Sequence, residues 1–445
     1  MASVADSSRI PAPSLPPGSA SAALRAARRS RSAARDQGGD PARGGGSLGA
    51  ERPLSEPLEG SSAPSGGRPL GINTGIAATV APQALQLPAS PDETRQKIRE
   101  VRRERYRLLD VVRKVFPKER TAACMHCMVP DSAVTLHRHR ETGKAFYSGL
   151  MTCGSVWLCS VCSSKISERR RTELSLAIER AQEKGWKVYL LTLTVPHGLG
   201  DDLKPMLDKL KKAWRRMGKN RDGEKVKDAI GFEGSVRAFE VTNGKNGFHP
   251  HFHALLFLDT DLTPEQVKAL YSPLWRRHCV AVGLPEPSDA HGCRVDGGEK
   301  AAQYVSKWGL PEEMTKSHLK KAKKGDSMWD LLRKWADNRD ASALVRFKLF
   351  YEAFKGERQL VWSKKVRELL RLGEELTDEQ LAQEQTEAAS VVAQLEPEDW
   401  CMLRKLGMKL DLLELAETRP ERVPDFLHRL RAMTREVGLD FEPSG

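Results

Sequence analysis

Three histidines alternate along one short stretch of the chain, His249-Pro250-His251-Phe252-His253. Alternate side chains of a β-strand share a face, so we expect the three imidazoles on one face and Phe252 against the core. Imidazoles spaced about 6 to 7 Å apart along a strand can converge on one cation. Pro250 cannot donate to a ladder, so this strand lies at a sheet edge or faces a gap there. The chain has only 11 histidines, and their concentration here favours metal binding over three ordinary half-exposed side chains.

A carboxylate is expected on the neighbouring strand, because two imidazoles alone leave the charge of a divalent cation uncompensated. Glu240 is the only acidic residue within residues 234–258. If the hairpin loop is the four residues 244–247, Glu240 lies opposite His251 on the same face. A register shifted by one residue would turn Glu240 away and leave it an ordinary exposed strand residue. Mixed imidazole and carboxylate ligation suits Mn²⁺ or Mg²⁺ acting as a Lewis acid.

Tyr304 is a candidate nucleophile in the sequence GGEKAAQYVSKW, residues 297–308. A phenol with a pKa of about 10 attacks poorly at neutral pH unless positive charge lies nearby. Lys307 comes three residues later, so on a helix it shares the face of Tyr304 and could favour the phenolate or hold a phosphate oxygen. Taken alone, the pattern is equally typical of a packed tyrosine beside a surface lysine.

Five of the eight cysteines fall between residues 124 and 162. The two close pairs C-M-H-C and C-S-V-C predict a structural Zn²⁺ site in a reducing compartment, with a spacing typical of four thiolate ligands. The predicted ligands are Cys124, Cys127, Cys159 and Cys162, with Cys153 as an alternative ligand and His126 as a weaker spare. The competing interpretation is a set of reduced structural cysteines. We expect Cys279, Cys293 and Cys401 to be unpaired thiols.

The elements around these residues predict an α+β domain built on an antiparallel sheet. Turn, capping and alternation patterns give the order strand, helix, strand, strand, helix, helix. The corresponding ranges are 186–195, 201–217, 235–242, 248–258, a helix beginning at Thr263, and 299–308, preceded by a helix over 163–185 that ends at Gly185.

The charge of the chain favours a nucleic-acid partner. Lys and Arg number 72 against 59 Asp and Glu, a net charge of +13. Basic residues gather in two runs that could neutralise phosphates, although a charge run alone is usually a solvated face. The first run is Lys209, Lys211, Lys212, Arg215, Arg216, Lys219 and Arg221, and the second is Lys316, Lys320, Lys321, Lys323 and Lys324.

The first 90 residues differ in composition from the rest of the chain. Of these, 55 are Ala, Gly, Pro or Ser, which predicts a disordered tail rather than a transit peptide. No run approaches the about 18 to 20 apolar residues of a membrane helix, so we expect no membrane association and a cytoplasmic protein. The predicted parts are a tail (1–90), a charged helix (91–120), a Cys-rich zinc module (121–165), a catalytic domain (166–325), a helical extension (326–372) and an acidic, helical C-terminal part (373–445).

Together, four segments resemble the plasmid rolling-circle replication initiator proteins, a branch of the HUH endonucleases. They are TCGSVWLCSVCSSKI (152–166), LTLT (191–194), GFHPHFHALL (247–256) and AAQYVSKW (301–308). The resemblance covers about residues 120–370, including GERQLVWSKKVRELL (356–370). It does not cover the N-terminal tail or the acidic C-terminal part.

The resemblance implies that His251 and His253 bind the divalent metal, and that Tyr304 attacks the scissile phosphate of one strand of origin DNA. The expected substrate is plasmid origin DNA, single-stranded or extruded as a hairpin. The products would be a 5′-phosphotyrosine link and a 3′-OH that primes synthesis, with host helicase and polymerase as further partners. Some relatives carry a Glu four residues before the nucleophilic tyrosine, and that Glu ends the replication cycle. In this chain the corresponding residue is Lys300, and the nearest acidic residue is Glu299, five residues before Tyr304.

Two other interpretations fit the same residues. A single-tyrosine HUH transposase or mobilisation relaxase would share the metal and the nucleophile, but would cut element ends or a transfer origin. A non-catalytic, zinc-dependent DNA-binding regulator would need neither the catalytic metal nor the nucleophile. Its function would therefore survive the change Tyr304→Phe.

Overall fold

The computed structural model describes residues 91–307, 325–383 and 386–437. The predicted tail and the second basic run lie outside the described residues. Helices and antiparallel strands make up the described part, which confirms the α+β class. The main helices are α2 (Pro91–Val115), α3 (Ser160–Glu183), α4 (Leu203–Lys219), α5 (Arg221–Ala229), α6 (Pro264–Val280), α7 (Gly298–Lys307), α9 (Met328–Asn338), α10 (Ala341–Phe354), α13 (Pro397–Lys405), α14 (Lys409–Thr418) and α15 (Val423–Val437). Short helical turns are η1 (Arg120–Ala122), α11 (Val366–Leu369), α12 (Asp378–Ala382) and η3 (Pro420–Arg422).

A five-stranded antiparallel sheet carries the histidine motif. Its strand order is β6-β3-β5-β4-β7. The strands are β3 (Lys187–Leu193), β4 (Phe232–Gly244), β5 (Gly247–Leu258), β6 (Cys293–Asp296) and β7 (Leu360–Trp362). The β4–β5 hairpin has the predicted register, with Glu240 opposite His251. Pro250 lies in the central strand, beyond the last β3–β5 pair, Leu193 with Phe252, so it faces the expected gap rather than a sheet edge.

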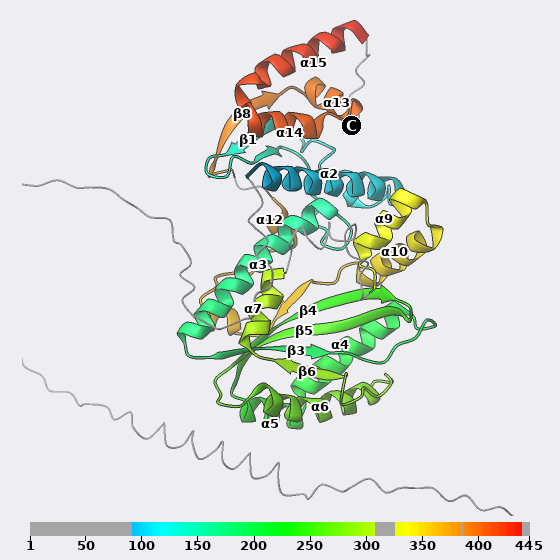
Figure 1. The fold of residues 1–445 in the computed structure, drawn as a ribbon, viewed down its shortest axis with the longest axis vertical. Helices are drawn as coiled ribbons and strands as arrows, with labels where there is room; N and C mark the ends of the chain where they lie inside the picture. The colour runs from blue at the N-terminus through cyan, green and yellow to red at the C-terminus, as the bar shows by residue number, and fades with distance from the viewer. Residues whose placement is uncertain (1–90, 308–324, 384–385, 438–445) are drawn as a thin grey trace, which may run out of the picture. The chain divides into compact units, whose positions relative to one another are not determined.

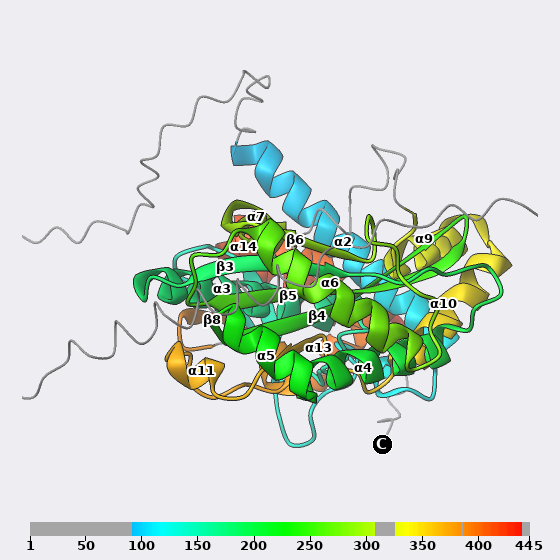
Figure 2. The same ribbon diagram turned by 90° about the horizontal axis from the view of Figure 1, so that it is seen from below.

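Helices cover both faces of this sheet (Figure 1). Phe252 and Leu256 of β5 point into a core that includes residues of α4 and α6. Leu255 and Phe257 alternate with these residues along β5, and they point to the other face of the sheet, into a second core with α3 and α7. Figure 2, the view from below, shows α4, α5 and α6 lying across the strands. By alternation the histidines share the face that α3 and α7 cover.

Local signals in the sequence set the ends of these helices. Thr263 caps α6 with a complete capping box, its hydroxyl accepting from the backbone of Gln266 while the Gln266 side chain accepts from the backbone of Thr263. Helix α3 stops where Gly185 adopts a φ of +76°, a conformation that a residue with a Cβ disfavours. Both ends agree with the sequence prediction.

A second sheet contains strands from two distant parts of the chain. Its order is β2-β1-β8, from β1 (Val134–His139), β2 (Ala145–Ser148) and β8 (Ala389–Leu395). Strand β8 comes from the acidic C-terminal part, which we expected to be helical in places and for which we predicted no strand. Its neighbours α13 to α15 bury Trp400 and Leu427 against Leu136 and Tyr147 of the Cys-rich region. The two regions therefore share one hydrophobic core.

The shortest elements of the main sheet were not expected from the sequence. Strands β6 and β7 have four and three residues, too few to show an alternating pattern. Helix α5 was not expected either.

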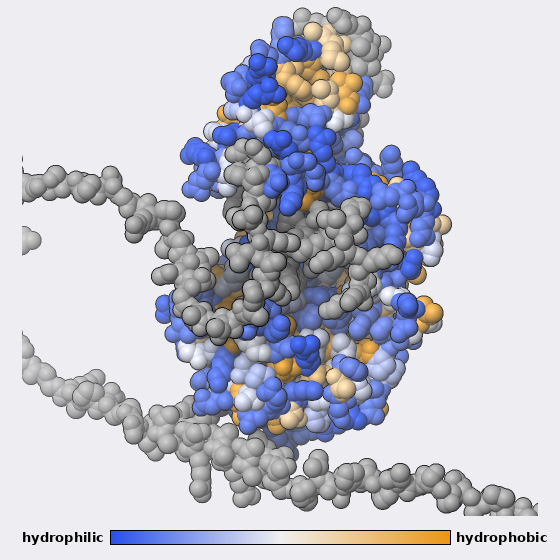
Figure 3. Space-filling view, in the orientation of Figure 1, coloured by the Kyte–Doolittle hydropathy of each residue, from blue (hydrophilic) through white to orange (hydrophobic). Residues whose placement is uncertain are grey.

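Among the described residues, no helix is long and apolar enough to cross a membrane. Hydrophilic residues cover most of the coloured surface in Figure 3.

Candidate functional site

Glu240, His251 and His253 converge on one point of the sheet. The Nε2 atoms of His251 and His253 lie 3.4 and 3.3 Å from Oε2 of Glu240. The three ligand atoms lie within 4.8 Å of one another. The residues are half-buried, and the Glu240 side chain keeps 38% of its surface exposed. The group therefore leaves one side open to an incoming substrate.

Hydrogen bonds to the other ring nitrogens aim both imidazoles at Glu240. The Nδ1 atom of His253 lies 2.9 Å from Oγ1 of Thr192, on β3, and Nδ1 of His251 lies 3.2 Å from the carbonyl oxygen of His249. A proton on each Nδ1 satisfies both contacts and leaves the Nε2 lone pairs pointing inward. The sequence prediction missed Thr192, although it lies in the LTLT segment, because the order of strands β3 and β5 could not be deduced.

The electrostatics of this group keep Glu240 in its charged carboxylate form. Burial alone would raise the pKa of Glu240, but hydrogen bonding to His251 and His253 outweighs it and holds that pKa well below its usual range. A carboxylate facing two imidazole nitrogens needs a proton or a metal between them. Adjacent ligands of an octahedral cation with bonds of about 2.1 Å lie about 3 Å apart. The observed separations and the mixed donor set fit such a cation.

Tyr304 reaches the same group from helix α7. Its ring centroid lies 4.8 Å from that of His253. Ala301 and Val305 on the same helix are buried in the core shared with α3 and β3, and they fix the rotation of α7 over the sheet. Tyr304 itself is half-buried at the edge of that core. Lys307 is the last residue of α7, and its side chain lies outside the described part of the structure.

His249 shares the face of the other two histidines but does not join the group. Its ring packs 5.1 Å from that of His251 and stacks at 4.4 Å on the ring of His197, in the loop after β3. Burial, with the nearby imidazoles, lowers the pKa of His249 to about 4. The structure therefore places His249 as a neighbour of the three converging side chains. The His197 contact was not expected from the sequence.

The acid nearest to the tyrosine in sequence is engaged elsewhere. The Gln303 side-chain amide donates to Oε1 of Glu299 at 2.9 Å, and Lys300 Nζ donates to Oε1 of Gln303 at 3.2 Å. All three residues belong to the exposed side of α7. The residue four positions before Tyr304 is Lys300, which is not acidic.

A second cluster consists of four buried cysteines. They are Cys124, Cys153, Cys159 and Cys162. Cys124 follows the η1 turn, Cys159 is the N-cap of α3, and Cys162 lies in the first turn of that helix. The thiols are free, with no disulfide. Cys127 lies outside the group and is replaced by Cys153, so the cluster differs from the predicted quartet at one position.

The spacing of the sulfur atoms matches a tetrahedral site. Cys124 Sγ lies 3.6 and 3.5 Å from the sulfurs of Cys159 and Cys162, and Cys153 Sγ lies 3.7 Å from that of Cys162. Four thiolates bonded to Zn²⁺ at about 2.3 Å in a tetrahedron would lie about 3.8 Å apart. Two ligands come from loops and two from α3, which explains why pair spacing alone did not single out Cys153.

The first basic run lies on α4 and at the start of α5. Lys211 pairs with Asp208 and Glu357, and Lys209 donates to the carbonyl of Gly283. The remaining members of the run are exposed and have no acidic partner among the described residues. They are Lys212, Arg215, Arg216, Lys219 and Arg221. Helix α4 packs against Phe252 and Leu256, on the sheet face opposite to the histidines. The basic run therefore lies on that opposite face.

Comparison with known proteins gives a consistent family. The family model of a replication protein, Rep_1, matches residues 150–405, more than half of the chain. A "Protein rep" of Streptomyces lividans is 28% identical, over 55% of this chain and 69% of that protein. A "Protein rep" of Bacillus amyloliquefaciens is 30% identical, over 32% of this chain and 42% of the relative. A "Neomycin resistance protein" of Streptomyces cyanogenus is 32% identical, over 29% of this chain and 36% of the relative.

No solved structure gives a significant match to the chain. The matched range contains the sheet, the histidine motif, helix α7 and three of the four clustered cysteines. The resemblance drawn from the sequence motifs is thereby confirmed at the level of the family. This chain belongs to the Rep_1 family of replication proteins, the plasmid Rep proteins.

Proposed function

We propose that this protein initiates rolling-circle plasmid replication by nicking and rejoining one DNA strand at the origin. The observation that carries the proposal is the contact between the rings of Tyr304 and His253. Support comes from the nearness of this phenol to a partly exposed group of two imidazoles and a carboxylate, in a chain of the Rep_1 family. A nucleophile next to an open three-ligand site is the arrangement that phosphodiester transfer needs.

In the proposed reaction, Oη of Tyr304 forms a bond to the scissile phosphorus and loses its proton to solvent. The bond from phosphorus to the 3′-oxygen breaks, and that oxygen leaves with the bonding pair and takes up a proton. The strand then ends in a 3′-OH, and its other part is joined to the protein through a 5′-phosphotyrosine. A later attack by a 3′-OH on this link reverses the step and rejoins the strand.

Glu240, His251 and His253 would hold the divalent cation, Mn²⁺ or Mg²⁺. When bound, the cation supplies Lewis-acid stabilisation of charge on the phosphoryl oxygens. Thr192 and the His249 carbonyl orient the imidazoles, and the cation of Lys307 would offset further charge. In this scheme His249 supports the ligands and is not one of them.

The four clustered cysteines would hold a structural Zn²⁺. Four buried thiolates complete a tetrahedral shell and leave no position for water or substrate. We infer an architectural role, in which the metal ties the start of α3 to the loops around Cys124 and Cys153. The substrate would be plasmid origin DNA, single-stranded or extruded, in the cytoplasm, with host helicase and polymerase as later partners.

The test uses labelled single-stranded circular DNA that carries a candidate origin. The full-length protein is incubated with it in Mn²⁺ or in EDTA, beside Tyr304→Phe, and the products are separated on a denaturing gel. The expected result is a covalent protein–DNA band that requires the metal and is absent for Tyr304→Phe. Tyr106→Phe, on helix α2, is a matched control that keeps the band.

The opposite result would be equally clear. If the wild-type chain binds origin DNA but forms no band on any origin tried, the nickase proposal fails and the regulator becomes the better description. A band that forms on element ends or on a transfer origin, but not on a replication origin, would favour the transposase or relaxase. Mapping the nick identifies which DNA is cut.

A further inference from the structure

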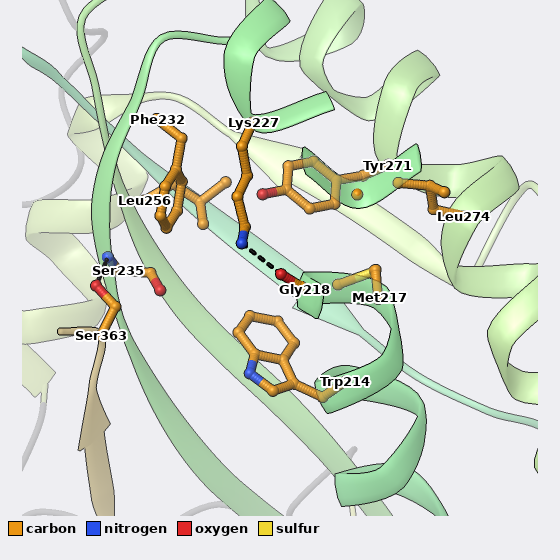
Figure 4. A pocket seen from close by; sticks show the side chains of 11 residues that line it. Trp214, Met217, Gly218, Lys227, Phe232, Ser235, Leu256, Tyr271, Leu274 and Ser363 are labelled. Carbon is orange, nitrogen blue, oxygen red and sulfur yellow. Dashed lines mark hydrogen bonds between the residues drawn. The ribbon is translucent and has the colours of Figure 1, made fainter. Parts of the chain in front are cut away.

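A pocket of about 150 Å³ opens on the sheet face opposite to the candidate catalytic site. Helices α4, α5 and α6 line it on one side, and β4 and β5 on the other. Figure 4 shows the Trp214 and Phe232 rings and the Tyr271 phenol arranged around the space. The floor is formed by Leu256 on β5. The pocket is thus bounded by three aromatic side chains.

The polar groups of the pocket are few, and one of them has no partner. Tyr271 is 6% exposed, and its hydroxyl points into the space (Figure 4) with no hydrogen-bond partner among the described residues. Lys227 Nζ lies beside it, donating to the carbonyl of Gly218 and, at 2.9 Å, to Glu224. Its oxygen is not one of the fully buried polar atoms that lack a partner, so solvent reaches it. A ligand in the pocket can therefore accept a hydrogen bond from Tyr271.

The volume of the pocket suits a single six-membered ring. A cavity of about 150 Å³ lined by apolar side chains accommodates a molecule the size of benzene. Aromatic walls with a few directed polar groups are what flat heterocycles require. A pyrimidine base satisfies both conditions, because its ring can stack on Trp214 while its carbonyl oxygens accept from Tyr271 and Lys227.

Exposed positive charge on the helices that line the pocket indicates the source of that base. The cations of α4 and α5 without an acidic partner lie next to Trp214 in the chain and are exposed. Proteins bind single strands by combining such a positively charged track with aromatic stacking platforms.

We propose that this pocket receives one unpaired pyrimidine base of a single DNA strand, whose phosphates lie along the cations of α4 and α5. Trp214 stacks on the base, and the Tyr271 hydroxyl donates to it. Arg215 and Arg216 neutralise neighbouring phosphates. The strand site is separate from the group around Tyr304, since the two lie on opposite faces of the sheet, and it goes beyond the nicking reaction.

The experiment measures binding of fluorescent 12-residue strands of dT, dA and abasic sugar-phosphate to the full-length protein. All proteins carry Tyr304→Phe, which removes the proposed nucleophile, so the result does not depend on nicking. Trp214→Leu should weaken dT binding about 5- to 100-fold, the range for losing one stacked base. It should leave the weaker abasic binding unchanged. The double variant Arg215→Gln, Arg216→Gln should weaken both and reduce the salt dependence.

Tyr271→Phe keeps the packing of the pocket and removes only the hydroxyl. It should weaken dT binding about 2- to 10-fold. Tyr189→Phe is the matched control, because that hydroxyl donates to the Leu262 carbonyl instead of the pocket, and it should bind dT like the parent. Melting temperatures of all variants verify that the fold is intact.

Two results would overturn the proposal. The first is equal weakening of dT and abasic strands by Trp214→Leu, or no weakening in either. The second is displacement of the dT strand by thymidine monophosphate at equimolar concentration, which would make the pocket a site for a free nucleotide. Stronger binding of dA than of dT would likewise exclude a pyrimidine pocket.

Discussion

The two candidate metal sites of this chain differ in closure and in the elements that build them. The cysteine cluster has four ligands, all fully buried, drawn from two loops and the first turn of α3. The group at Glu240 has three partly exposed ligands, of which Glu240 is the most exposed, and all lie on paired strands of one sheet. A closed shell suits a metal that supports the fold, whereas an open one suits a metal that meets a substrate.

The difference teaches what each site needs from its surroundings. Loops can be drawn together by the metal itself, so the cysteines need only arrive in the same place on folding. A site that acts on a substrate must keep its geometry before the substrate arrives. Adjacent strands in a fixed register, with Thr192 holding the ring of His253, provide that rigidity.

The largest effect is expected from breaking the closed site. Cys159→Ser removes one of four buried thiolates, and structural zinc in small modules contributes about 10 to 16 kcal/mol of apparent binding free energy. That is as large as the typical stability of a whole domain, about 5 to 15 kcal/mol, so we expect loss of bound zinc and unfolding of the cysteine region. Atomic emission on the purified protein and a thermal melt measure both.

A matched pair of cysteines sharpens this test. Cys127→Ser should keep one zinc per chain and the wild-type melting temperature, because Cys127 lies outside the group. Cys153→Ser should lose the zinc. If Cys127→Ser loses the metal and Cys153→Ser retains it, the four-cysteine grouping is incorrect.

A smaller and purely functional effect is expected from the open site. Glu240→Gln keeps the shape of the side chain and removes the charge that balances the cation, so nicking at fixed Mn²⁺ should fall about 100-fold or more. The zinc content and the melting temperature should stay at wild-type values. A drop in zinc content in this variant would mean that the two sites are not independent.

The smallest effect is expected from the residue that orients a ligand. Thr192→Val removes the hydroxyl beside Nδ1 of His253 and should raise the Mn²⁺ concentration for half-maximal nicking about 10- to 100-fold. Saturating Mn²⁺ should restore the rate. Thr194→Val is the control, since its hydroxyl donates to the His291 carbonyl. Equal responses of the two variants would argue against an orienting role for Thr192.

The sequence predicted the strands and helices that carry long patterns. The β4–β5 hairpin, its register and the ends of α3 and α6 agree with the structure, because alternation, turn residues and caps are local signals. Strand β6, with only four residues, gave no such signal. Strand β8 was also missed, because its pairing with β1 joins regions about 250 residues apart.

The contacts of the candidate site likewise divide into those set by local sequence and those set by the packing of remote elements. Glu240 and His251 share a hairpin, so their meeting could be deduced from the register alone. Thr192 belongs to β3, which pairs with β5 only in the folded sheet, and Tyr304 reaches His253 because α7 packs over that sheet. Neither contact follows from spacing along the chain.

Residue types and motif order were enough to identify which residues could do chemistry and the family of this protein. The tertiary structure decided that Cys153 and not Cys127 joins the cysteine cluster, that His249 stands beside the three converging side chains, and that an aromatic pocket opens on the opposite face. Residue types and local periodicity can be read directly from the sequence. Distances between remote side chains depend instead on how strands pair and helices pack.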